Sequence, residues 1–165
     1  MDTNELRALQ GPLKQQYRDL PDAAFITLRA KGRIDEGVTC NIETGRALAK
    51  AGLHPATGGD GLSLCSGDLL LQALVACAGV TLNAVATSLG IELRDASLEA
   101  EGDLDFRGTL GVSKEVPVGF QHIRLRIVLD TDASDEQITT LLRLTERYCV
   151  VFQTLSHSPT LELVR

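Results

Sequence analysis

The sequence predicts a single α+β domain in which an antiparallel sheet packs against two central helices. Three patterns predict this class. A long apolar segment, Ser66–Leu89, has the length and composition of a buried helix and is followed by Gly90. Two segments alternate between apolar and polar residues in the manner of strands. A second amphipathic segment begins at Ser134 with a helix-capping pattern.

The N-terminal segment Asn4–Leu20 predicts a short amphipathic helix, which Gly11-Pro12 would interrupt and divide into two pieces. Its apolar side carries Leu6, Leu9, Leu13 and Tyr17. We expect residues 1–22 to form a helical extension and residues 23–165 to form the domain itself.

A β-hairpin is predicted next. Phe25–Lys31 and Gly37–Ile42 are rich in Ile, Thr and Val, and Gly32–Glu36 would form the turn between them. The following segment, Gly45–Ser63, contains glycine, proline and small polar residues, so we expect a loop there.

The central helix is predicted to begin at Ser66 as N-cap, with Asp68 in its first turn, where a carboxylate favours the helix dipole. The helix is apolar on nearly every side, so it must be enclosed on nearly every side. A domain of this size buries such a helix most easily by forming a dimer around it. Gln72 and Asn83 interrupt the apolar segment, and this favours a core helix over a membrane span.

Two strands are predicted from alternation, with outer faces of opposite charge that would attract each other if the strands pair. In the first, the inward residues are Leu98, Ala100, Gly102, Leu104 and Phe106, and the outward ones are Glu99, Glu101, Asp103 and Asp105. In the second, the inward residues are Ile123, Leu125, Ile127 and Leu129, alternating with His122, Arg124, Arg126 and Val128.

The second central helix is predicted to start with a capping box formed by Ser134 and Gln137. One stripe of this helix carries Ile138, Leu141, Leu142, Thr145 and Cys149, so Cys149 should point toward the core near the helix end. Thr160–Val164 is predicted to close the domain as a last strand.

Composition excludes several functions. The net charge is −6, the pI is near 5.0, aromatic residues make up 4% and tryptophan is absent. An acidic surface repels nucleic acids and anionic membranes, and few aromatic side chains are present for base stacking. No basic and apolar leader opens the chain, so we expect a cytoplasmic protein that binds neither nucleic acid nor membrane.

The four cysteines (Cys40, Cys65, Cys77 and Cys149) are not expected to form a structural disulfide framework in a reducing cytosol. They lack the close pairing typical of zinc ligands, and His54, His122 and His157 are scattered, so we expect no metal and no cofactor. The sequence contains no G-x-S-x-G nucleophile elbow, and its Gly58–Gly61 segment lacks the lysine of a phosphate-binding loop.

Two cysteine segments resemble the signatures of the OsmC/Ohr family. Ser66–Cys77 resembles a segment in which a Ser/Asn-Pro-x-Glu start opens a long helix that carries a peroxidatic cysteine. Thr145–Val151 resembles a second signature, usually Ala-Glu-x-Tyr-Cys-Pro-Val, which carries the resolving cysteine. The resemblance runs from about Phe25 to the C-terminus. Ser66 and Val150 stand where these signatures have proline.

The resemblance implies an intertwined homodimer and a peroxidase that reduces organic hydroperoxides. Cys77 would become a sulfenic acid, Cys149 would condense with it to a disulfide, and a dithiol or thioredoxin-like reductant would reduce that disulfide.

In the family an arginine pairs with the thiolate and a glutamate fixes the arginine. Asp68 occupies one of the two carboxylate positions, although as a residue of the first turn it equally fits a helix-start charge. Arg46 and Arg33 are the candidate arginines, ahead of Arg29, and each is also explained as a surface charge. Two alternatives remain open: a non-catalytic module that binds a small hydrophobic ligand in the dimer-interface pocket, and a purely structural dimer.

Overall fold

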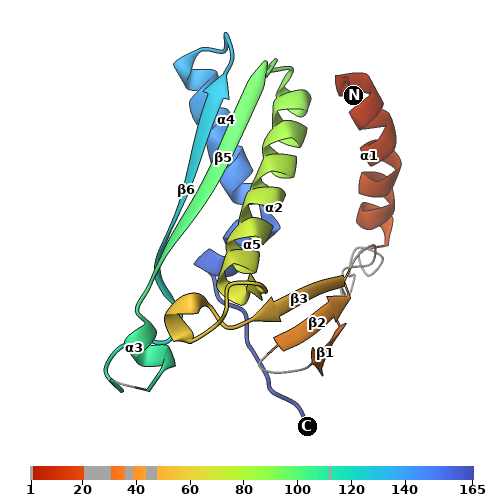
Figure 1. Cartoon of the computed structure of the whole chain (residues 1–165). Helices are drawn as coiled ribbons and strands as arrows, with labels where there is room; N and C mark the ends of the chain where they lie inside the picture. The colour runs from red at the N-terminus through yellow and green to blue at the C-terminus, as the bar shows by residue number, and fades with distance from the viewer. Residues whose placement is uncertain (1, 21–30, 36–38, 44–47, 112) are drawn as a thin grey trace. The chain divides into compact units, whose positions relative to one another are not determined.

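The computed structural model describes residues 2–20, 31–35, 39–43, 48–111 and 113–165 (Figure 1). Its elements are α1 (Thr3–Asp19), β1 (Lys31–Asp35), β2 (Thr39–Glu43), β3 (Leu48–Gly52), the 3-10 helix η2 (Pro55–Thr57), β4 (Leu64–Cys65), α2 (Ser66–Leu89), β5 (Asp95–Leu104), α3 (Phe106–Thr109), β6 (Phe120–Asp130), α4 (Asp135–Tyr148) and α5 (Val150–Ser156). The mixture of helices with small, mainly antiparallel sheets confirms the predicted α+β class.

The chain divides into two compact units. The helical unit comprises Met1–Ile26, Ala73–Glu99 and Arg126–Arg165, and the sheet unit comprises Thr27–Gln72 and Ala100–Leu125. We describe each unit by itself.

The core of the helical unit lies between α2 and α4. Leu82, Ala86 and Leu141 are 0–1% exposed, and apolar residues of β5 and β6 pack against them, among them Leu98 and Ile127. At the end of α2, Gly90 has φ 69°, a left-handed conformation that glycine adopts without a steric penalty, and the N–H of Ile91 bonds to the carbonyl of Ala86. The predicted helix and its stop are both confirmed.

The sheet unit contains a four-stranded sheet of order β1-β2-β3-β4. In the antiparallel β1–β2 pair Arg33 lies opposite Asn41, so most of the predicted turn Gly32–Glu36 is in fact strand. The part of the predicted first strand before Lys31 lies outside the described residues.

Our prediction of a loop over Gly45–Ser63 was partly wrong, because it contains β3 and η2. Leu48–Gly52 has the sequence LAKAG, which has little intrinsic strand preference. It is held in the sheet by pairing with β2 on one side and with β4 on the other, where Gly52 lies opposite Cys65. Tertiary pairing therefore overrides the local sequence.

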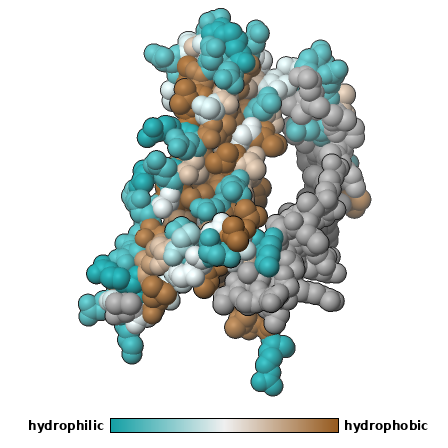
Figure 2. All heavy atoms as spheres, viewed as in Figure 1, coloured by the Kyte–Doolittle hydropathy of each residue, from teal (hydrophilic) through white to brown (hydrophobic). Residues whose placement is uncertain are grey.

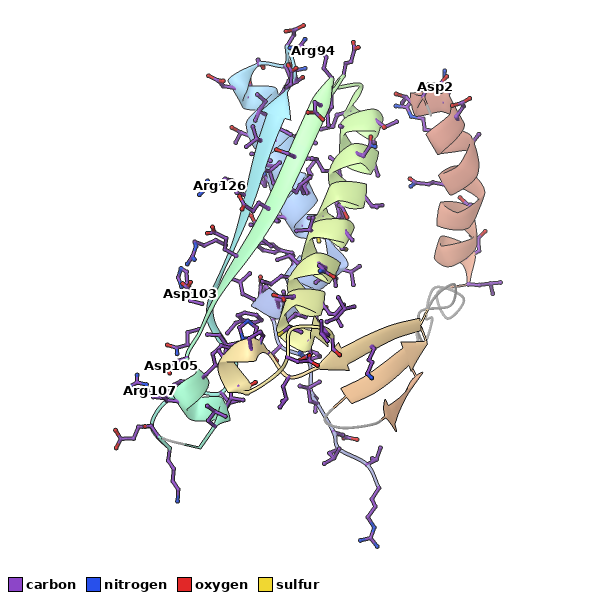
Figure 3. All side chains as sticks on the ribbon, viewed as in Figure 1. Asp2, Arg94, Asp103, Asp105, Arg107 and Arg126 are labelled. Atoms are coloured by element: carbon purple, nitrogen blue, oxygen red, sulfur yellow. The ribbon has the colours of Figure 1, made fainter. Side chains whose placement is uncertain are left out.

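β5 and β6 pair with each other, and the burial of each strand alternates along its length as the sequence pattern predicts. Charges of opposite sign meet on the outer face: the guanidinium of Arg124 lies 2.8 Å from the Oδ1 of Asp103 and 3.2 Å from the Oε2 of Glu101. Figure 3 shows a further pair, Asp105 beside Arg107 at the start of α3, with 2.6 Å between Oδ2 and Nη2.

The predicted capping box is present at the start of α4. The Ser134 hydroxyl accepts a bond from the Gln137 N–H at 3.3 Å, and the Gln137 side chain accepts one from the Ser134 N–H at 2.9 Å. The predicted core stripe of this helix is also confirmed, from Leu141 at 0% exposure to Cys149 at 1%.

Two predictions at the chain ends were wrong. α1 continues through Gly11 and Pro12 as one helix, although a proline inside a helix removes one main-chain hydrogen bond and crowds the carbonyl four residues before it. Thr160–Val164 is not a strand. The described residues offer it no partner strand, and Leu163 stays fully exposed, because alternation without a pairing edge does not hold a strand.

Candidate active site

Cys77 and Cys149 lie side by side in the helical unit. Cys77 is half-buried in the middle of α2, and Cys149 is buried between α4 and α5. Their side chains are hydrogen-bonded to each other. The structure thus brings together the two cysteines that sequence reasoning singled out, although they are 72 positions apart in the chain.

A break in the helix positions Cys149. It ends α4, where its N–H bonds to the Thr145 carbonyl at 3.0 Å, and its φ of −72° and ψ of 108° are extended rather than helical. Its carbonyl accepts the first bond of α5, from the Gln153 N–H at 2.9 Å. Val150, Val151 and Phe152 are the first residues of α5, and their N–H groups have no partner within that helix.

The groups around Cys77 lower the pKa of its thiol. Partial burial raises the pKa of the Cys77 thiol, but hydrogen bonds from the Val151 N–H, the Cys149 thiol and the Val150 N–H outweigh it. The pKa of Cys77 therefore lies below its ordinary value.

Cys149 shows the opposite direction. Burial raises the pKa of Cys149, and the neighbouring Cys77 raises it further, while N–H groups of Phe152 and Val151 lower it only in part. The half-buried Cys77 is therefore the member of the pair with the lowered pKa, and the buried Cys149 is the member with the raised pKa.

No charged side chain comes from the elements that hold this pair within the helical unit. α2 from Ala73 to Leu89 and the whole of α5 lack charged residues. On α4 the nearest in sequence are Glu146 and Arg147, both exposed, and Arg147 lies over the Tyr148 ring at 5.7 Å. The polarity around Cys77 in this unit comes from main-chain and hydroxyl donors.

A mostly apolar cavity of about 560 Å³ shares Thr81 with the thiol pair. The Thr81 hydroxyl donates to the Cys77 carbonyl at 2.8 Å, one turn back along α2. The other lining residues are Gln10, Val80, Ala84, Val85, Ser88, Leu89, Leu144 and Tyr148. An apolar wall with a few hydroxyl groups suits a small, largely hydrophobic molecule.

The other predicted site residues lie in the sheet unit. Asp68 is exposed in the first turn of α2 and lines a separate cavity of about 620 Å³ together with Cys65 and His54. In that cavity the His54 ring stacks on Phe106, with ring centroids 5.0 Å apart. Arg33 lies on β1, but its side chain is not among those described, and the same holds for Cys40 on β2.

Arg46 and Arg29 lie outside the described residues. Within the described part of the chain no group of three or more His, Cys, Asp or Glu side chains could hold a metal ion.

Sequence reasoning missed three members of the site: Thr81 and the N–H groups of Val150 and Val151. Thr81 follows Cys77 by four residues on one helix, a spacing that places it on the same face and could have indicated it. The main-chain donors carry no sequence signal except that neither residue is proline.

Comparison with known proteins identifies the family and the fold of the chain. A family model described as OsmC-like protein matches residues 58–164, more than half of the chain. No curated protein matches the chain in sequence.

Among solved structures, the chain is similar to an OsmC-like protein from Mycoplasma pneumoniae, with 16% identity, coverage of 81% of this chain and 89% of that one, and a TM-score of 0.67. It is also similar to an organic hydroperoxide resistance protein, OsmC, from Legionella pneumophila (19% identity, 81% and 92% coverage, TM-score 0.63) and to the organic hydroperoxide resistance protein OhrB of Bacillus subtilis (21% identity, 82% and 94% coverage, TM-score 0.54). At these identities the likeness shows the fold.

Proposed function

Since this chain belongs to the family of OsmC-like proteins, we propose that it is a thiol-dependent peroxidase that reduces organic hydroperoxides through Cys77 and Cys149. The observation that carries the proposal is the hydrogen-bonded thiol pair, in which the more accessible sulfur has the lower pKa. A two-cysteine peroxidase needs this difference in pKa. Its first cysteine attacks the peroxide as a thiolate, and its second keeps its proton until the sulfenic acid has formed.

The reaction balances with these two residues and one external reductant. The Cys77 thiolate attacks one oxygen of the peroxide; an S–O bond forms, the O–O bond breaks, and the departing alkoxide takes up a proton to leave as the alcohol. The Cys149 sulfur then attacks the Cys77 sulfenic acid; an S–S bond forms, and hydroxide leaves as water with the Cys149 proton. A dithiol or thioredoxin-like protein reduces the disulfide by exchange and restores both thiols.

The cavity that shares Thr81 supports a substrate with an apolar tail. Its volume of about 560 Å³ exceeds what hydrogen peroxide requires, and its walls are mainly aliphatic. We propose Asp68, with Arg46 or Arg33, as further members of the site, in the roles that the family gives to its carboxylate and its arginine.

Homodimer formation is the second part of the proposal. Three large side chains are exposed: Val80 at 74%, Val150 at 70% and Tyr148 at 59%. In Figure 2 hydrophobic atoms follow the course of α2 on the viewed face. By length and composition α2 would also pass as a membrane span, but core helices of soluble proteins pass the same test. A partner subunit packed against this helix in a cytoplasmic dimer would remove its apolar surface from water. Light scattering on the purified protein measures its mass and so distinguishes a dimer from a monomer.

The test of the peroxidase is direct. One equivalent of cumene hydroperoxide is added to the reduced protein, and cysteine pairing is mapped by mass spectrometry. We expect a rapid Cys77–Cys149 disulfide, and loss of peroxide consumption in Cys77→Ser. The matched control is Cys65→Ser, which removes another half-buried thiol, in the sheet unit, and should leave the pairing intact.

Unchanged turnover in Cys77→Ser would refute the proposal. Thiols that stay free after peroxide addition would instead favour a non-catalytic module that binds a small hydrophobic ligand in the apolar cavity.

A further inference from the structure

The sheet unit contains a cavity of about 620 Å³ that includes neither cysteine of the thiol pair. All of its lining residues belong to this unit, and none of them also lines the cavity that shares Thr81 with the thiol pair. The wall is mostly apolar, and Leu53, Leu70 and Val118 of its lining are exposed. Apolar side chains that stay open to water around a hollow are typical of a ligand site.

Aromatic rings form part of this wall. The His54 ring stacks on Phe106, with centroids 5.0 Å apart and planes inclined by 20°. The Phe120 ring lies close to the main chain at Gly102 and Gly67, where an added Cβ would come within 2.5 Å and 3.3 Å of ring atoms. A side chain at either glycine would displace this ring. Aromatic walls favour a ligand that has a ring of its own, because stacked and edge-to-face ring pairs add to the gain from apolar burial.

The His54 ring supplies a positioned hydrogen-bond donor. Its Nδ1 accepts a bond from the Ala56 N–H at 3.0 Å, as the N-cap of η2. The His54 carbonyl accepts bonds from the N–H groups of Thr57 at 2.8 Å and Gly59 at 3.1 Å, so the main chain here is held as well. Because Nδ1 accepts, the neutral ring carries its proton on Nε2. Within the described part of the chain no acceptor is bonded to Nε2, and it is therefore the ring nitrogen left for a ligand.

The charge of the lining sets a second requirement. Asp68 is exposed in the first turn of α2. Among the described residues that line the cavity it is the only carboxylate, and none is lysine or arginine. An anionic ligand would be repelled by Asp68 and would lose its hydration in a mostly apolar space. An uncharged ligand avoids both costs.

We propose that this cavity is a second ligand site, which binds a small, uncharged aromatic carbonyl compound. The ring of the ligand packs among His54, Phe106 and Phe120, and its carbonyl oxygen accepts a hydrogen bond from Nε2 of His54. The site shares Asp68 with the proposed peroxidase but holds its ligand through His54, so the two proposals stand or fail separately.

Benzamide and benzoate test the inference, because they have nearly the same shape and differ in charge. Each is titrated into the ¹⁵N-labelled full chain at about pH 8, where imidazole rings are ordinarily neutral, and long-range ¹H–¹⁵N spectra follow the histidine nitrogens. We expect benzamide to shift Nε2 of His54 and to leave the exposed His122 and His157 unchanged. Benzoate should bind at least about tenfold more weakly, because no cation in the lining compensates its charge.

His54→Asn tests the donor itself. Asparagine keeps a side-chain oxygen that can cap η2, and it removes the ring together with Nε2. We expect the Kd of benzamide to rise about tenfold, the effect of losing one hydrogen bond and one ring contact. His122→Asn is the matched control, since it makes the same substitution at an exposed histidine of the same unit and should leave the Kd unchanged.

Benzamide that leaves His54 unshifted would overturn the inference. Equal benzamide affinity in the wild type and His54→Asn would overturn it too, as would benzoate that binds as tightly as benzamide. The wild-type titrations decide the matter even if His54→Asn does not fold. No readout involves peroxide, so loss of the peroxidase proposal would leave this inference standing.

Discussion

Gly102, in the second half of β5, has no room for a side chain. A Cβ built on it would lie 2.5 Å from both Cδ1 and Cε1 of Phe120, a neighbour in the same unit. Carbon atoms in contact normally stay about 3.5–4 Å apart, so the ring would have to withdraw by about 1 Å. Overpacking of this kind costs about 1–3 kcal/mol, while alanine regains about 0.4–1 kcal/mol by restricting the unfolded chain. We therefore expect Gly102→Ala to lower the free energy of unfolding by about 1–2 kcal/mol.

Urea denaturation followed by circular dichroism measures this loss, and Gly79→Ala is the control. The same substitution on α2 places its Cβ at 3.7 Å from Leu98 Cδ1, an ordinary contact, and should raise stability by up to about 1 kcal/mol because alanine favours helix. Adding Phe120→Leu to Gly102→Ala should cost less than the two separate losses together. If Gly102→Ala unfolds at the same urea concentration as the wild type, Phe120 does not fill the space beside Gly102 and the packing described for the sheet unit is wrong.

Two further predictions concern capping and pH. Ser134→Ala should lower the free energy of unfolding by about 1 kcal/mol, since the Gln137 N–H loses its acceptor, and Ser134→Asn, which keeps a side-chain oxygen, should restore most of it; equal melting temperatures for all three proteins would contradict the capping role. Hydrogen bonds from Arg124 hold the pKa of Asp103 below its ordinary value, so the carboxylate stabilises the fold above the unfolded-state pKa and this contribution is lost as the pH falls through the folded-state pKa. The stability advantage of the wild type over Asp103→Asn should therefore shrink below about pH 4 and at high salt, and a constant difference from about pH 6 to about pH 2 would exclude the ion pair as its source.

The parts of the fold that could be predicted are the elements with a periodic sequence pattern. The alternation of the segments now seen as β5 and β6 set which residues face inward, and the Ser134–Gln137 spacing set the start of α4. These signals are local, since each depends on residues a few positions apart. Strands that depend on distant partners were not predictable in the same way: β3 forms from a weak sequence because β2 and β4 flank it, whereas Thr160–Val164 alternates well and has no partner.

In the candidate site, too, local features could be predicted and contacts between distant residues could not. The helical stripe of α4 predicted that Cys149 is buried, and its approach to Cys77 followed only from the resemblance of two short segments to known signatures. Which arginine would pair with the Cys77 thiolate could not be predicted from sequence, because several candidates precede α2 and nothing local distinguishes them. Nor could the cavity of about 560 Å³, since its walls come from three helices that only tertiary packing brings together.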